Sequence, residues 1–202
     1  ARGNGNFRVS YYNKGDFRMF GNYTIDEGMY KLSMQEIIRK DFVLQSGSTV
    51  TFTGDPYQAN LDVKAAYTVN SVSLSDLSTD ASLTQSTVKV NCIMNLTGSL
   101  ANPTIKFDLE LPTVNEEDRE LVRSATSTEE QMNTQIIYLL GIGKFYAYYY
   151  NQNSNQSSSA TSSLAFSTLS GQLNNMLSQV MENKNWNVGA NFSSGQEGWS
   201  DV

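Results

Sequence analysis

The chain has 202 residues, a net charge of -6 and an isoelectric point near 4.6. An acidic surface does not suit the phosphate backbone of nucleic acid, and it also disfavours a polybasic membrane-surface module. The absence of histidine and the single cysteine exclude Ser-His-Asp catalysis, histidine metal sites and an internal disulfide. No segment reaches the roughly 18 apolar residues of a transmembrane helix, and the first residues lack the apolar core of a signal peptide.

The first two-thirds of the chain has the period-two alternation of β-strands. Apolar side chains alternate with polar ones over residues 17–25, 30–34, 88–96 and 105–111, with turn signals at 26–28 and 45–48. Because successive strand residues point to opposite faces, each segment has one apolar and one polar face. This pattern predicts a sheet that is wet on one side only. Cys92 shares the apolar register and is expected to be a buried thiol.

The stretch from Val50 to Tyr67 raises the question of what covers the apolar face. A short unit occurs twice, starting at Thr53 within this stretch and again at Thr97. It consists of Thr-Gly, a Pro-containing turn and alternating apolar residues. Such repetition favours an elongated sheet over a closed globule. Chance similarity between two ordinary hairpins explains the repeat equally well.

The apolar period changes from two to 3.6 after Pro112. Residues 115–118, Asn-Glu-Glu-Asp, form an acidic helix start. Residues 127–130 read as a capping box with Ser127 as the N-cap and Glu130 reaching back. We expect helices near 115–142 and 165–182, with Gly141–Lys144 ending the first rather than binding phosphate, since no P-loop pattern surrounds it.

Composition divides the chain into four segments of one domain. These are a β-strand segment over 1–112, a helical segment with an aromatic end over 113–150, a flexible Asn/Ser linker over 151–163, and an amphipathic helix with the start of terminal strands over 164–202. Strand-like residues lie at both ends, so we expect a fragment of a longer protein.

The order of these motifs resembles the C-terminal domain of TamB, the translocation and assembly module protein of the AsmA-like superfamily, in a Bacteroidota-like version. The resemblance covers nearly the whole chain. The most specific motif is "GSTVTFTGDPYQANLD". The family order is also kept by four weaker motifs, one before it and three after it: "GNYTIDEGMYKLS", "LTGSLANPTIKFDLELP", "EEQMNTQIIYLLGIGKF" and "LSGQLNNMLSQV". The long Asn/Ser tract departs from the family pattern, as does the lack of its further strands.

The resemblance implies a mainly β fold, an elongated curved sheet folded into a hydrophobic trough with two amphipathic helices in the C-terminal half. It implies a non-enzymatic, cofactor-free segment in the periplasm, within a protein anchored to the inner membrane and reaching the outer membrane. The implied function is phospholipid transport between the membranes, outer-membrane protein assembly, or both. The implied partners are phospholipid acyl chains and a TamA/BamA-family barrel protein.

Two sets of candidate site residues follow. The lipid-groove candidates share the apolar strand register: Val50, Phe52, Leu61, Val63, Val88, Val90, Met94, Leu96, Ile105, Phe107 and Leu109. The second helix supplies candidates for docking a partner or the end of the sheet: Leu169, Leu173, Met176, Leu177 and Val180.

Two other classes of function remain open at this point. An ordinary β-sandwich binding module, such as an adhesin or glycan binder, would cover the apolar face with a second sheet. Tyr148–Tyr150 would then be candidate sugar contacts. An enzyme is the weakest interpretation, because the adjacent carboxylates at 26–27 and 116–117 have no partner that the sequence places across a cleft.

Overall fold

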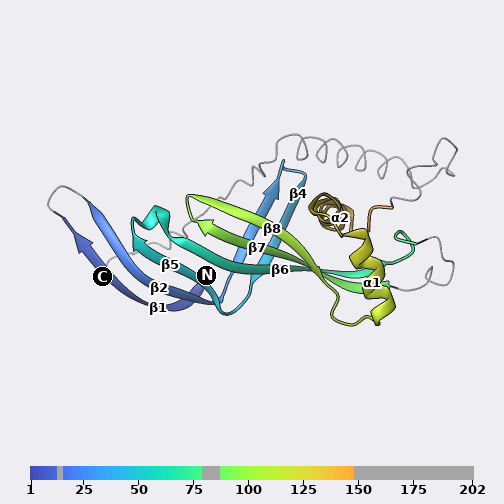
Figure 1. The fold of residues 1–202 in the computed structure, drawn as a ribbon, viewed down its shortest axis with the longest axis horizontal. Helices are drawn as coiled ribbons and strands as arrows, with labels where there is room; N and C mark the ends of the chain where they lie inside the picture. Colours follow the sequence, from blue (N-terminus) through green and yellow to red (C-terminus); the bar gives the residue numbers. More distant parts are fainter. Residues whose placement is uncertain (13–15, 79–86, 148–202) are drawn as a thin grey trace, which may run out of the picture.

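The computed structural model describes residues 1–12, 16–78 and 87–147. They form one antiparallel eight-stranded sheet and two α-helices near one end of it (Figure 1). The elements are β1 (Arg2–Tyr11), β2 (Phe17–Glu27), β3 (Met29–Met34), β4 (Ile38–Leu44), β5 (Ser48–Gly54), the 3-10 turn η1 (Pro56–Gln58), β6 (Asn60–Ser73), β7 (Thr87–Ser99), β8 (Asn102–Glu110), α1 (Glu116–Ala125) and α2 (Glu129–Ile142).

Strand β6 is the strand at which the sheet divides. One of its edges pairs with β7, which pairs in turn with β8. The other edge is shared: residues 60–62 pair with β5, and Ala65 and Ala66 pair with the end of β4. Strands β2 and β1 continue outward from β5, while β3 continues outward from β4. The β3–β4 hairpin therefore leaves the sheet as a separate branch, drawn steeply across β6 in Figure 1.

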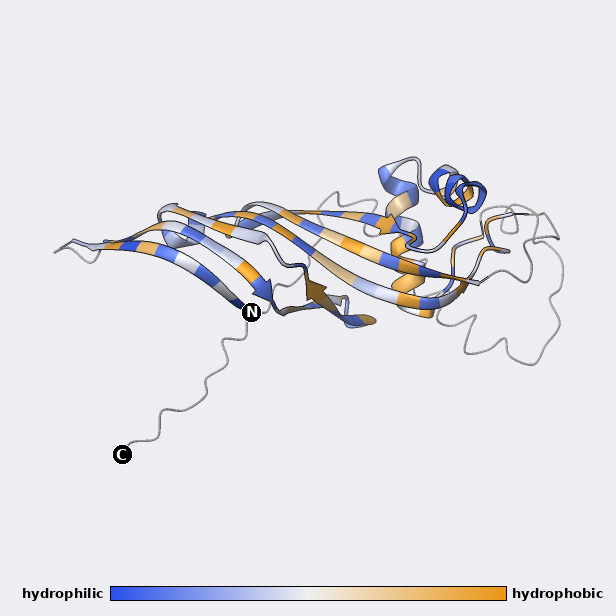
Figure 2. Cartoon of the chain, turned by 90° about the horizontal axis from the view of Figure 1, so that it is seen from below, coloured by the Kyte–Doolittle hydropathy of each residue, from blue (hydrophilic) through white to orange (hydrophobic). Residues whose placement is uncertain are grey.

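The predicted division into an apolar and a polar face is confirmed. Side chains directly opposite one another share a face, and three such rows across the sheet are apolar: Phe7, Gly21 and Phe52; Tyr23, Val50 and Leu61; Val63, Leu96 and Ile105. The rows between them carry asparagine, threonine, aspartate and lysine. Figure 2 shows this alternation as orange and blue bands along the strands. We call these surfaces the apolar face and the polar face.

Helix α2 and the β3–β4 hairpin cover part of the apolar face. Ile136, Ile137 and Leu140 of α2 are at most 1% exposed, and they belong to one hydrophobic cluster with Phe42 of β4 and Val90 of β7. The described residues contain a single sheet, so a helix here takes the place that a second sheet has in a β-sandwich.

The two helices begin at side-chain caps. Asn115 accepts a hydrogen bond from the Asp118 amide at 2.7 Å, and the acidic first turn follows as predicted. The prediction that Ser127 caps the next helix is wrong. Thr128 is the N-cap, with its hydroxyl accepting from the Gln131 amide at 3.1 Å and the Gln131 side chain accepting from the Thr128 amide at 3.2 Å.

The shift of the cap by one residue has a simple cause. Thr128-x-x-Gln131 satisfies the capping-box pattern as well as Ser127-x-x-Glu130 does. The sequence pattern therefore allows a cap at either position, and the observed hydrogen bonds place it at Thr128. Helix α2 ends as predicted within Gly141–Lys144, because Gly143 adopts the left-handed conformation at φ 70°.

The linker over 151–163, the helix near 165–182 and its docking candidates lie outside the described residues. Among the residues that the structure describes, no helix has both the length and the apolar character needed to cross a membrane.

Candidate apolar groove

All eleven groove candidates lie on the apolar face, as the strand register requires. Seven are buried in the hydrophobic cluster that includes α2: Leu61, Val63, Val88, Val90, Met94, Leu96 and Phe107. Val50, Ile105 and Leu109 are half-buried and pack against this cluster. Phe52 is half-buried and lies outside it. The candidates therefore extend from a closed core to a more open region at β5.

The open region is centred on three aromatic rings. Phe7 stacks on Tyr23 with ring centroids 6.2 Å apart and meets Phe52 edge to face at 5.8 Å. Gly21 lies between Phe7 and Phe52 in the same cross-strand row, with φ 136° and no side chain to separate the rings. A β-carbon at Gly21 would lie 2.0 Å from the Asn6 carbonyl oxygen. Glycine is therefore required both for the backbone and for this aromatic contact.

Beyond these rings the apolar face is exposed along the β1–β2 hairpin. Phe7 is 43% exposed, Val9 54%, Tyr11 74% and Phe17 46%. Reasoning from sequence did not single out these four residues, although the alternation from Phe7 to Tyr11 carried the signal. They were not among the groove candidates because a strand pattern predicts the face on which a side chain lies. It does not predict which helices or strands pack against that face.

Helix α2 makes buried polar contacts as well as apolar packing. Gln135 of α2 is fully buried, and its amide donates to the Tyr146 carbonyl at 3.1 Å while its oxygen accepts from the Tyr146 amide at 2.7 Å. The Tyr138 and Tyr146 rings pack edge to face at 4.8 Å. Burial, with a smaller contribution from Tyr146, raises the pKa of Tyr138 to about 12, so this hydroxyl stays protonated at neutral pH.

One cation also lies on the apolar face. Lys40 is directly opposite Leu32, and its ammonium lies 5.3 Å from the centre of the Tyr67 ring. Tyr67 also packs against Phe42, with ring centroids 5.8 Å apart. The flexible stem of a lysine can cover apolar surface while its charge remains in contact with water or a ring face. Burial raises the pKa of the nearby Tyr30 hydroxyl, which therefore also remains neutral.

Two further groups have shifted pKa values without forming a reactive site. Cys92 is fully buried, as predicted, and burial raises its pKa to about 12. A protonated, enclosed thiol is a poor nucleophile. Burial raises the pKa of Asp76, partly offset by the charge of Lys144.

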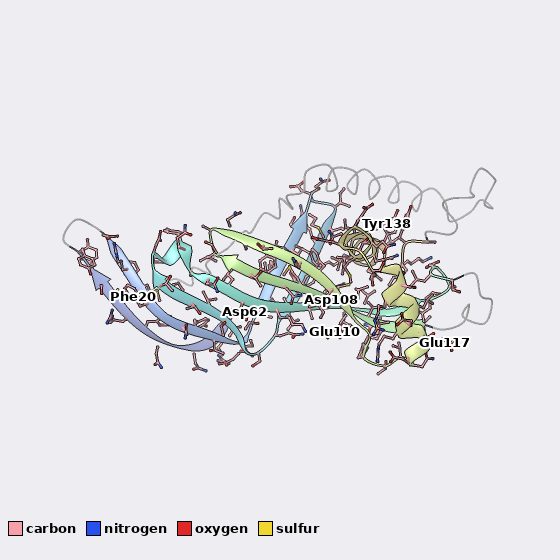
Figure 3. The ribbon with its side chains drawn as sticks, in the orientation of Figure 1. Phe20, Asp62, Asp108, Glu110, Glu117 and Tyr138 are labelled. Carbon is pink, nitrogen blue, oxygen red and sulfur yellow. The ribbon has the colours of Figure 1, made fainter. Side chains whose placement is uncertain are left out.

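A separate cleft of about 510 Å³ lies between the end of β8 and the helices. Its lining combines Leu111, Val122 and Met132 with charged residues that include Arg119 and Glu110. These charges are already paired, since Arg119 bonds Glu116 at 2.9 Å and Glu110 bonds Lys64 at 2.7 Å. Figure 3 shows Asp108 and Glu110 on the same stretch of β8. Arg119 and Glu110 are therefore engaged in ion pairs at the protein surface.

Three of the four carboxylates that the sequence places side by side are engaged in surface contacts. Asp26 accepts from the side-chain amide of Asn4 at 2.7 Å, Glu27 pairs with Arg2 at 3.0 Å, and Glu116 pairs with Arg119. Within the described ranges, no group of three or more potential ligands is placed to hold a metal ion. The candidate functional surface is therefore the apolar face, which α2 covers at one end and which is exposed along the β1–β2 hairpin at the other.

An open sheet with one apolar face, partly covered by a helix, defines a protein that offers an apolar surface for contact rather than a small enclosed active site. The chain belongs to the TamB C-terminal domain family, whose model matches residues 1–200. No curated protein and no solved structure matches the chain. Membership supports a role in outer-membrane assembly or lipid transport, a place in the periplasmic part of the cell envelope, and contact with outer-membrane assembly partners. The family is not known for enzymes.

Proposed function

We propose that this chain is a non-enzymatic segment of a periplasm-spanning protein and that its apolar face carries phospholipid acyl chains between the inner and outer membranes. In the full-length protein, an inner-membrane anchor would hold one end. A TamA/BamA-family barrel protein would meet the other end, where the same surface would also serve outer-membrane protein assembly. Family membership and the open apolar face support this proposal.

The observation that carries the proposal is the continuity of the apolar face from the buried core to the exposed hairpin. Taken together, the three apolar rows named above reach from β8 through β7, β6, β5 and β2 to β1, and they contain no charged residue. Each methylene of an acyl chain that is buried on such a surface contributes about 0.8 kcal/mol. Because Leu61 and Phe107 are 7% and 8% exposed, acyl chains would bind beyond them, against Phe52 and its ring partners.

A photo-crosslinking amino acid at Phe52 of the full-length protein, in cell envelopes, tests the proposal. We expect ultraviolet light to produce phospholipid adducts at position 52, detected by mass spectrometry of the purified protein. Thr51 is the matched control: it is the adjacent residue of the same strand, also half-buried, on the polar face. Lipid adducts at both positions, or only intramolecular crosslinks at position 52, would contradict a lipid-carrying face.

A charge at the same place gives a second test. Phe52→Arg should reduce phospholipid crosslinking at a neighbouring probe position, Val50. It should lower the melting temperature modestly without unfolding the chain, because Phe52 loses its contact with Phe7 but lies outside the hydrophobic cluster. Thr51→Arg is the control. Crosslinks to a barrel protein in place of lipid would favour the outer-membrane assembly role over lipid transport.

A further inference from the structure

The end of the β1–β2 hairpin differs in chemistry from the rest of the sheet. Residues 7–20 hold five aromatic residues in fourteen, against 11% in the whole chain. They also hold three cations and one anion, a net charge of +2 in a chain of net charge -6. An acidic protein therefore has one short segment that is both aromatic and basic. In Figure 1 this hairpin end lies far from α1 and α2.

Aromatic rings lie on both faces of this hairpin end. Tyr11 and Phe17 are directly opposite each other on the apolar face. Phe20 belongs to the polar face, opposite Arg8, and is labelled near the free end of the hairpin in Figure 3. In the remaining strands that the structure describes, the polar face carries no aromatic residue. A hairpin whose two faces are both partly apolar does not suit the edge of a water-exposed sheet.

The two arginines of this segment lie against its aromatic rings. The Arg8 guanidinium lies 5.3 Å from the centre of the Phe20 ring, and the Arg18 guanidinium lies 5.8 Å from that of Tyr12. Arg18 also pairs with Asp16 at 3.1 Å, whereas Arg8 has no carboxylate partner among the described residues. Aromatic rings with arginine beside them are typical of protein segments at the level of lipid headgroups, where the ring meets the acyl region and the cation meets phosphate.

We propose that the free end of the β1–β2 hairpin docks into the surface of a lipid bilayer. Val9, Tyr11 and Phe17 enter the boundary between headgroups and acyl chains, and Arg8 binds lipid phosphate. A bilayer fits better than a protein surface because this segment combines exposed apolar side chains with a net positive charge in an otherwise acidic molecule, which matches an anionic lipid surface. Since the same apolar face continues into the proposed groove, docking would place the open end of the groove at the membrane.

Vesicle flotation of the 202-residue chain tests this inference. The probes are vesicles of phosphatidylcholine alone and vesicles of equal parts phosphatidylcholine and phosphatidylglycerol. We expect the chain to float with the mixed vesicles at low salt, to float less at high salt because the phosphate–arginine attraction is screened, and to float weakly with phosphatidylcholine alone. A chain that stays with the soluble fraction in every mixture would overturn the proposal.

Two valines give a matched pair of variants. Val9 is 54% exposed on the hairpin, and Val43 is 57% exposed on the polar face of β4. Val9→Asp should lower vesicle binding roughly tenfold or more, whereas Val43→Asp should leave it unchanged. Equal effects of the two variants would overturn the proposal. If Val9→Asp lowers the melting temperature, Tyr11→Ser replaces it, since a side chain that is 74% exposed has little packing to lose.

Arg8 tests the electrostatic part separately. Arg8→Gln should remove most of the preference for mixed vesicles while weak binding to phosphatidylcholine persists; an unchanged preference would overturn the assignment of Arg8. The proposed groove is judged by crosslinking at Phe52, which does not depend on vesicle binding. Lipid adducts at Phe52 without flotation would therefore contradict the docking hairpin alone, and flotation without adducts would contradict the groove alone.

Discussion

Phe7 of β1 and Phe52 of β5 contact each other across an intervening strand, with their rings edge to face and the centroids 5.8 Å apart. The strand between them contributes Gly21, which leaves the space that the two rings fill. Such aromatic pairs contribute roughly 0.5–1.5 kcal/mol beyond the apolar area that they bury. The contact joins the β1–β2 hairpin to the remainder of the apolar face, and it makes Gly21 the residue whose replacement should affect the open end most.

Gly21→Ala should destabilise the chain by about 1–3 kcal/mol, because alanine at φ 136° is strained and its β-carbon would meet the Asn6 carbonyl. Gly47→Ala is the control: its φ of 89° is also unfavourable for alanine, but nothing lies within 4 Å of the added carbon. Urea unfolding of both variants measures the difference. Equal losses would show that the close approach at Gly21 contributes nothing.

Ile137→Ala should cost about 2–5 kcal/mol, since this residue of α2 is fully buried in the hydrophobic cluster and its loss leaves a cavity. Phe17→Ala removes a larger side chain that is 46% exposed, and it should cost far less. Thermal unfolding followed by circular dichroism distinguishes the two. A small effect at Ile137 would mean that α2 does not close this end of the apolar face.

Thr128→Ala should lower stability by about 1 kcal/mol, because it removes the side chain that caps α2. Ser127→Ala removes only a hydroxyl contact to the Gln131 side chain, 2.8 Å long and exposed, so its effect should be smaller. Chemical unfolding of both variants checks the position of the cap. A larger loss at Ser127 would restore the cap that the sequence pattern first suggested.

Stability should fall as the pH rises above about 9. Burial raises the pKa of Cys92 from its ordinary 9.0 to about 12. Between these values the unfolded chain releases the thiol proton while the folded chain retains it. Fewer protons bound to the unfolded state means a free energy of unfolding that decreases with rising pH. Tyr138, whose pKa is raised from 10.0 to about 12, adds to this decrease.

Urea unfolding between pH 7 and pH 11 measures this dependence, and Cys92→Ala isolates the thiol. The variant should lose stability less steeply above pH 9 than the native chain, whatever its stability at pH 7. The thiol of the folded native chain should also react slowly with a disulfide reagent at pH 8. Parallel pH profiles for the two proteins would contradict the assignment to Cys92.

The local features of this protein follow from short-range patterns in its sequence. Alternation fixed which side of each strand is apolar, since neighbouring strand residues must point to opposite faces. Pro112 and the acidic turn after it predicted the change from strand to helix, and Gly143 ends α2 where the glycine-rich stretch was expected to end it. The same rule predicts correctly that every groove candidate lies on the apolar face.

The cover of the apolar face, and the place where that face stays open, depend on tertiary contacts that no local pattern specifies. The attachment of β4 and β5 to one edge of β6 depends on contacts between residues far apart in the chain, and no local pattern specifies such pairing. The sequence allows a capping box at Ser127 or at Thr128, and only the structure shows that Thr128 caps α2. Because burial depends on all the elements that meet at a surface, Val90 and Val9 have the same local pattern, yet one is buried and the other is 54% exposed.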